Sequence, residues 1–166
     1  MMKKIAALLL LTALVVSACQ SPKEKALSKI KGLEGNDSAF TNELMTELKT
    51  AYVDFAKAYP DDELAPEYLF KAAQRSIALE LPNEALEHLN MLAEKYPKSP
   101  LVEDATFLAA YTCENNLNDL PKAKALYEEF VKKYPKSELA KDAQFALENL
   151  GKSPEEVLQN LPETED

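Results

Sequence analysis

The chain has 166 residues and a formal net charge of −9, from 28 acidic and 19 basic side chains. This length suits one domain with its own core. Arg75 is the only arginine, and binding to nucleic acid needs clustered cations for counterion release and bidentate contacts. Composition and charge therefore exclude nucleic acid as a partner. With 3 glycines, 10 prolines and no alternation of period two, an all-α fold is expected.

Residues 1–18 have the pattern of a lipoprotein signal peptide. Lys3-Lys4 precedes the apolar run Ile5–Val16, which is too short to span a bilayer. The run ends in Val16-Ser17-Ala18-Cys19, which resembles the lipobox of bacterial lipoproteins. That resemblance implies cleavage before Cys19, lipidation of Cys19 and stable attachment through several acyl chains. An Asp directly after the cysteine is the usual signal for retention in the inner membrane of enteric bacteria. This chain has Gln20 there, which favours the outer membrane. The alternative is an ordinary signal peptide with a chance cysteine.

Residues 19–36 are expected to form the lipidated cysteine and a tether. Ser21-Pro22-Lys23-Glu24 combines an N-cap, a first-turn proline and a capping-box glutamate, so a short helix to about Lys31 is predicted. Gly32 and Gly35 then loosen the chain. The first long helix is expected to be capped within Asn36-Asp37-Ser38 and to end at Pro60.

A Tyr-Pro pair recurs with a period of 37 and 38 residues through the region 37–162, which is the expected repeat domain. Leucine follows each proline by four residues and phenylalanine by ten, and a period in this range is typical of a helical solenoid. The predicted helices cover 64–79, 82–96, 101–114, 121–134 and 139–150. A capping box at Ser153 is expected to start a short amphipathic helix that covers the open end of the stack, before a disordered tail over 163–166. The three pairs are Tyr59-Pro60, Tyr96-Pro97 and Tyr134-Pro135.

The second helix of each predicted pair carries a tetratricopeptide signature. Ala85 precedes Leu89 by four residues, Ala123 precedes Tyr127 by four, and each alanine lies twelve residues before a proline. Over about 38–161 the chain resembles periplasmic tetratricopeptide proteins. They include the Tol-Pal-associated cell-division coordinator, the outer-membrane-protein assembly lipoprotein and small Bacteroidetes-type lipoproteins. The resemblance implies an all-α tetratricopeptide superhelix.

The chain also departs from that family pattern. Ala72-Ala73 and Ala109-Ala110 stand where the family has Leu-Gly, and there is no tryptophan. The coordinator has an N-terminal coiled coil for which this chain has no room, and the assembly lipoprotein has about five repeats. The specific roles of the coordinator and of the assembly lipoprotein are therefore not assigned to this chain.

Family geometry implies a partner-binding concave face built from the first helix of each unit. Each unit would offer an acid, a phenylalanine three residues later, and a polar or aromatic residue four beyond, all on one helix face. The alternative is that the phenylalanines pack between neighbouring helices. The residues are Glu67, Phe70 and Gln74; Asp104, Phe107 and Tyr111; and Asp142, Phe145 and Asn149.

No constellation of catalytic residues is present, so the protein is not expected to be an enzyme or to bind a cofactor or metal. Cys113 lies in an apolar helical pattern and is expected to be a buried core residue. His88, flanked by Glu87 and Asn90, is expected to face solvent, and a single histidine is no metal site.

The sequence thus predicts a lipid-anchored adaptor facing the periplasm from the outer membrane. It would bind another envelope protein through its concave face, in outer-membrane assembly or Tol-Pal-type maintenance. Two alternatives are a helical-repeat enzyme or small-ligand receptor, which would need a closed apolar pocket, and a structural spacer without a fixed partner.

Overall fold

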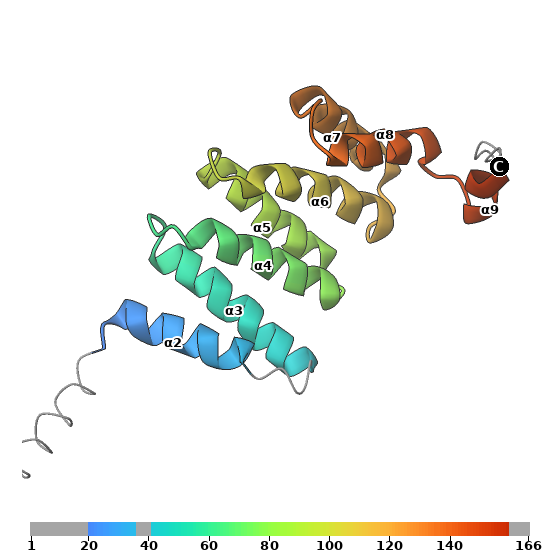
Figure 1. The fold of residues 1–166 in the computed structure, drawn as a ribbon. Coiled ribbons are helices and arrows are strands. Elements are labelled where there is room, and N and C mark those ends of the chain that lie inside the picture. The colour runs from blue at the N-terminus through green and yellow to red at the C-terminus, as the bar shows by residue number, and fades with distance from the viewer. Residues whose placement is uncertain (1–19, 36–40, 160–166) are drawn as a thin grey trace, which may run out of the picture.

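The computed structural model describes residues 20–35 and 41–159, and Figure 1 shows their helices following one another as a stack. Within these ranges there are helices and turns but no strand. The helices are α2 (Pro22–Glu34), α3 (Asn42–Ala58), α4 (Ala65–Ala78), α5 (Pro82–Lys95), α6 (Leu101–Asn115), α7 (Leu120–Lys133), α8 (Leu139–Asn149) and α9 (Pro154–Gln159).

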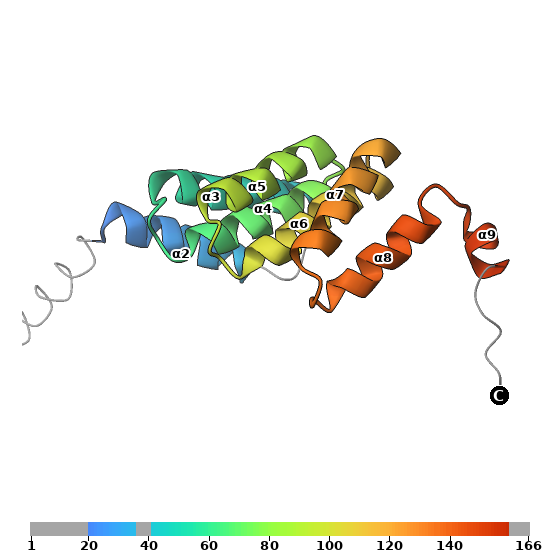
Figure 2. The same cartoon turned by 90° about the horizontal axis from the view of Figure 1, so that it is seen from above.

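The helices from α2 to α8 form two layers, as Figure 2 shows from above. One layer contains α2, α4, α6 and α8, which we call the first-helix layer; the other contains α3, α5 and α7. Each helix from α2 to α7 packs against the next one along the chain, and α4 also contacts α6. Together these contacts make antiparallel helix pairs, which confirms the all-α tetratricopeptide-type superhelix.

The Tyr-Pro turns that follow α3, α5 and α7 share a proline that ends one helix and a hydrogen bond that precedes the next. Proline cannot continue a helix and disfavours helical geometry in the residue before it. Two residues beyond each proline, a side-chain oxygen accepts a hydrogen bond from the backbone N–H two positions later, where the next helix begins. The three bonds join Asp62 to Leu64 (2.9 Å), Ser99 to Leu101 (3.3 Å) and Ser137 to Leu139 (3.1 Å).

Small side chains lie buried within the helix pairs. Ala73, Ala85, Ala110 and Ala123 are fully buried, and an alanine methyl lets two helices approach closely. The core is divided into two clusters. The N-terminal one is aromatic, with Tyr52 stacked on Tyr68 at a centroid separation of 5.2 Å; the other extends from α3 to α8.

The predicted tether contains a helix that is part of the stack. α2 runs to Glu34 rather than to about Lys31, and it continues through Gly32 because it packs against α3 and buries Ile30. Its capping box at Ser21 is present as expected. Three helix pairs therefore precede α8, one more than the two full pairs expected.

The start of the first long helix differs from the prediction. α3 begins at Asn42, and the hydroxyl of Thr41 accepts a hydrogen bond from the Leu44 N–H. The N-cap expected within 36–38 lies outside the described residues. So do the predicted signal peptide (1–18), the lipidated Cys19 and the tail over 163–166, which stay predictions.

The short C-terminal helix does not cover the end of the stack. The capping box at Ser153 forms as expected, but Figure 1 shows α9 beyond the end of α8, away from α2–α7. Leu158 is 67% exposed. The expectation that this segment caps the open end is wrong for residues 154–159, because a helix of 6 residues that follows an extended turn does not reach back onto α8.

Candidate functional site

The predicted partner-binding residues lie in the first-helix layer, three each on α4, α6 and α8. Five of them are exposed in the described structure: Gln74, Asp104, Tyr111, Asp142 and Phe145. The other four are half-buried: Glu67, Phe70, Phe107 and Asn149. The stack thus places these residues from three repeats in one layer of helices. Their role in binding stays a prediction.

The three phenylalanines of this layer differ in environment. The ring of Phe107 makes edge contacts with Tyr127 at 5.8 Å and Phe130 at 5.5 Å between centroids. Phe70 packs against the same core cluster. Phe145, at the end of the stack, is 49% exposed. A continuous exposed row of phenylalanines is therefore absent from the described residues, and the exposed aromatics of the layer are Tyr111 and Phe145.

The acids of the layer differ too. Glu67 forms an ion pair with Lys71 at 2.9 Å, and Lys71 also reaches Glu34 of α2 at 3.0 Å. Glu34 accepts a hydrogen bond from the Tyr52 hydroxyl at 2.8 Å; burial and this bond raise the pKa of Tyr52 to about 12. Within the described ranges, Asp104 and Asp142 form no hydrogen bond or ion pair through their carboxylates.

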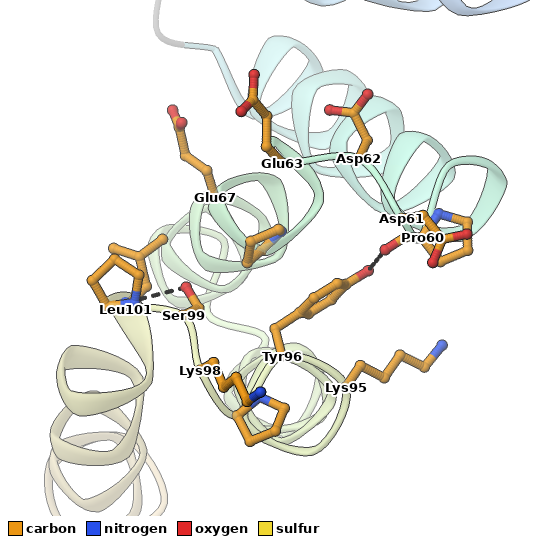
Figure 3. A pocket seen from close by; sticks show the side chains of 13 residues that line it. Pro60, Asp61, Asp62, Glu63, Glu67, Lys95, Tyr96, Lys98, Ser99 and Leu101 are labelled. Atoms are coloured by element: carbon orange, nitrogen blue, oxygen red, sulfur yellow. Dashed lines mark hydrogen bonds between the residues drawn. The ribbon is translucent and has the colours of Figure 1, made fainter.

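A hollow of about 920 Å³ lies at the edge of the stack, between the α3–α4 turn and the α5–α6 turn. We call it the Tyr96 hollow, because Figure 3 shows this ring crossing between the two turns. The Tyr96 hydroxyl donates a hydrogen bond to the Pro60 carbonyl at 2.9 Å, which ties the turns together. Glu67 lines the hollow as well, so it adjoins the first-helix face. Its apolar lining is Pro60, Pro66, Tyr96, Pro97, Pro100 and Leu101.

Charged side chains of opposite sign stand on opposite sides of the hollow. Asp61 and Glu63 belong to the α3–α4 turn, whereas Lys95 and Lys98 belong to the end of α5 and the turn that follows (Figure 3). All four are exposed. With the described residues they make no side-chain hydrogen bond or ion pair, unlike neighbouring Asp62, which pairs with Lys23 of α2.

The next turn along the stack has the same sequence pattern but a different arrangement. There the Ser137 hydroxyl donates a hydrogen bond to Glu103 at 2.5 Å. Counting from the aligned leucines Leu64 and Leu101, Glu103 corresponds to Pro66, which has no side-chain acceptor. Ser99 therefore has no equivalent bond, and nothing joins the two sides of the Tyr96 hollow at this point.

Sequence reasoning did not identify the lining of the hollow as a site. The signal that points to it is the difference between repeats: Pro66 stands where Glu103 stands one unit later. That difference acquires meaning only when the turns are placed side by side, because the two partners of the Ser137 bond are 34 residues apart.

The groups with potential chemistry are isolated and buried. His88 is 7% exposed, with neither ring nitrogen hydrogen-bonded in the described structure, so the expectation of a solvent-facing histidine is wrong. It lies one helical turn after the buried Ala85 and shares its face; burial lowers the pKa of His88. Cys113 is buried, as expected, and burial raises the pKa of its thiol.

Neither a metal centre nor a membrane span is found in the described ranges. They hold no group of three or more His, Cys, Asp or Glu side chains suited to a metal ion. None of their helices has the length and apolar character needed to cross a bilayer.

Comparison with known protein families identifies the family of the chain. The family model YfiO, described as an outer membrane lipoprotein, matches residues 62–153, which is more than half of the chain. The matched part runs from within the α3–α4 turn to the start of the α9 capping box and includes the lining of the Tyr96 hollow except Pro60 and Asp61. No curated protein matches the chain.

Proposed function

Because the chain belongs to the YfiO family of outer membrane lipoproteins, we propose that it is a lipid-anchored adaptor that binds another envelope protein through its first-helix layer. The observation that carries this proposal is the set of exposed, unpaired side chains on that layer. Tyr111 is 45% and Phe145 49% exposed, and Asp104 and Asp142 lie beside them on the same helices.

These side chains suit protein recognition for a physical reason. Aromatic rings at a surface offer large contact areas at a small entropic cost, and unpaired carboxylates select partners with basic groups. The buried, separate positions of His88 and Cys113 favour a non-catalytic scaffold, since general acid–base or nucleophilic chemistry needs an accessible group with a partner in reach.

The proposed anchor is Cys19, acylated after removal of residues 1–18. Its support is the apolar run and the Val16-Ser17-Ala18-Cys19 sequence, together with the family match. We place the protein in the outer membrane, facing the periplasm, and assign it to outer-membrane assembly or to Tol-Pal-type envelope maintenance.

The anchor is tested by labelling cells with an alkyne fatty acid and comparing the wild type with Cys19→Ser. We expect label only in the wild type. After centrifugation, we expect less of the unlabelled variant than of the wild type in the membrane pellet. Equal labelling of the two proteins would rule out Cys19 as the acylation site.

The binding face is tested by site-specific photocrosslinking in cells. A photoreactive residue at position 111 or 145 should give discrete adducts with an envelope protein. The same residue at exposed Ala125 on α7, in the other layer, is the matched control. Adducts from position 125 alone would place binding on the wrong layer, and adducts from none of the three would favour a spacer.

A further inference from the structure

We propose that the Tyr96 hollow is a docking site for an extended segment of the partner protein. The segment would carry apolar residues over the hollow, a basic residue toward Asp61 and Glu63, and an acidic residue toward Lys95 and Lys98. This inference rests on the proposed adaptor function and names the kind of segment that is recognised.

The apolar lining sets the first requirement of that segment. Four of its residues are prolines: Pro60, Pro66, Pro97 and Pro100. Proline has no backbone N–H, so these walls offer rings and carbonyl groups rather than donors for a ladder of hydrogen bonds. An extended polyproline-II-type segment keeps its own backbone solvated and needs no such ladder. Proline-rich walls therefore favour an extended segment over a strand that pairs with its receptor.

The charges on the two sides set the second requirement. Asp61 and Glu63 lie on the α3–α4 side of the hollow and Lys95 and Lys98 on the α5–α6 side, and the acids and lysines form no hydrogen bond or ion pair with one another in the described structure. A segment crossing the hollow would meet carboxylates at one end and ammonium groups at the other. Complementary charges at both ends determine the direction in which the segment binds, because the reversed orientation places like charges together.

Two contacts hold the site in shape before a segment arrives. The Tyr96 hydroxyl donates a hydrogen bond to the Pro60 carbonyl at 2.9 Å, and Lys23 of α2 pairs with Asp62 of the α3–α4 turn. A preformed site loses less conformational entropy on binding than a mobile one. The hollow is thus a preorganised feature of the junction.

Pro66 explains why the two sides of this hollow are not joined by a hydrogen bond like the one beside the smaller hollow, of about 540 Å³, at the α7–α8 turn. At the α7–α8 turn Glu103 accepts the Ser137 hydroxyl and joins the two sides. The same bond at the Tyr96 hollow would need a carboxylate at position 66. Replacing Pro66 with Glu supplies it, in the first turn of α4 where acidic residues are favourable. Pro66→Ala is the matched control, since it removes the ring without adding an acceptor.

The experiment is a selection of twelve-residue peptides from a random display library on the purified full-length chain. We expect enriched peptides with apolar or proline centres, a basic residue at one end and an acidic residue at the other. The charge-exchanged variant Asp61→Lys, Glu63→Lys, Lys95→Glu, Lys98→Glu has the same net charge and should enrich the opposite order. Enrichment of the same order on both proteins, or of no peptide, would overturn the proposal.

Affinity measurements on one enriched synthetic peptide complete the test. Pro66→Glu should weaken binding at least tenfold at an unchanged melting temperature, while Pro66→Ala binds within threefold of the wild type.

Three outcomes separate this inference from the adaptor function. If Tyr111→Ala abolishes binding and Pro66→Glu does not, the peptide occupies the first-helix face and the hollow inference fails while the adaptor function stands. Peptide binding at the hollow without crosslinked partners in cells would instead count against the adaptor function. Dimerisation of the chain that Pro66→Glu abolishes would make a second copy the occupant and overturn the proposal.

Discussion

The interior of the stack and its C-terminal end are built from the same repeat, yet equivalent residues have different environments. Phe107 of α6 contacts Tyr127 and Phe130 of α7, whereas Phe145 of α8 is 49% exposed. The reason is that α7 follows α6 as a full second helix and only the detached α9 follows α8. A repeat signature therefore specifies how a helix pairs, while the following helix decides what stays exposed.

The turns of the two regions differ in the same way. Tyr96, in the interior, reaches the carbonyl of Pro60 in the preceding turn. Tyr134, at the end, donates no such bond in the described structure, and its ring is covered by the Lys133 ammonium at 5.2 Å. The α5–α6 turn is therefore joined to the preceding turn by the Tyr96 hydroxyl. The α7–α8 turn is joined to α6 by the hydrogen bond from Ser137 to Glu103.

The largest expected effect separates the two phenylalanines. Phe107→Ala should lower the free energy of unfolding by about 3 kcal/mol, because it leaves a cavity against two aromatic rings. Phe145→Ala should change it by no more than about 0.5 kcal/mol, as for other surface positions. Urea denaturation followed by circular dichroism measures both. Equal losses would show that the end of the stack is covered by a segment outside the described residues.

A second pair of substitutions tests what the two regions share. Ala85 and Ala123 are both fully buried, so Ala85→Leu and Ala123→Leu should each cost about 1–3 kcal/mol through overpacking. The measurement is again the urea midpoint with its slope. A clearly smaller cost for Ala123→Leu would show that α7 adjusts its position where α5 cannot.

His88 offers a pH test of the interior. Burial lowers its pKa in the folded state, while Glu87 and Glu84 oppose this decrease and Lys49 and Lys57 add to it. The folded chain therefore binds fewer protons than the unfolded chain, and stability falls as the pH drops below the unfolded pKa of about 6.5. A tenfold difference in the proton affinity of the imidazole between the two states corresponds to about 1.4 kcal/mol of stability.

The matched variant comes from the next repeat, where Leu126 occupies the position of His88. His88→Leu should raise stability at pH 5 by more than at pH 8, because only the histidine must be kept uncharged. Urea midpoints at the two pH values give the comparison. An equal change at both would mean that another group carries the acid sensitivity.

The smallest expected effect separates the tyrosines. Tyr96→Phe removes the bond to Pro60 and should cost about 0.5–1 kcal/mol, as for a partly exposed hydrogen bond. Tyr134→Phe should be neutral within error. Thermal unfolding of the two variants beside the wild type checks this, and equal costs would contradict the different roles of the two hydroxyls.

Much of the fold could be predicted because its determinants are local. Pro60, Pro97 and Pro135 mark helix ends, and the capping boxes at Ser21 and Ser153 formed as the residues indicated. Apolar spacing alone predicts that Cys113 lies in the core, where it is buried. Such signals need only neighbours within about four residues, and that is the range over which helix chemistry acts.

The errors and omissions concern residues whose environment is set by distant segments. His88 has polar neighbours in sequence, but its place one turn after Ala85 puts it between helices. α9 is amphipathic, yet nothing local determines whether it docks. The Tyr96 hollow depends on two turns that are 36 residues apart, and only the comparison of Pro66 with Glu103 gives a hint of it.

The position of α2 has a consequence for how the protein is oriented at a membrane. Its first turn lies beside the α3–α4 turn through the Lys23–Asp62 ion pair, on the edge where the Tyr96 hollow opens. Only Gln20 and Ser21 separate α2 from Cys19, a distance of roughly 10 Å when extended. With acyl chains on Cys19, that edge would lie close to the lipid headgroups, and the opposite edge about 20 Å farther out, the length of a 14-residue helix. An integral membrane protein could then insert a juxtamembrane segment into the hollow, while a freely diffusing periplasmic protein would first meet the α4–α5 and α6–α7 connections.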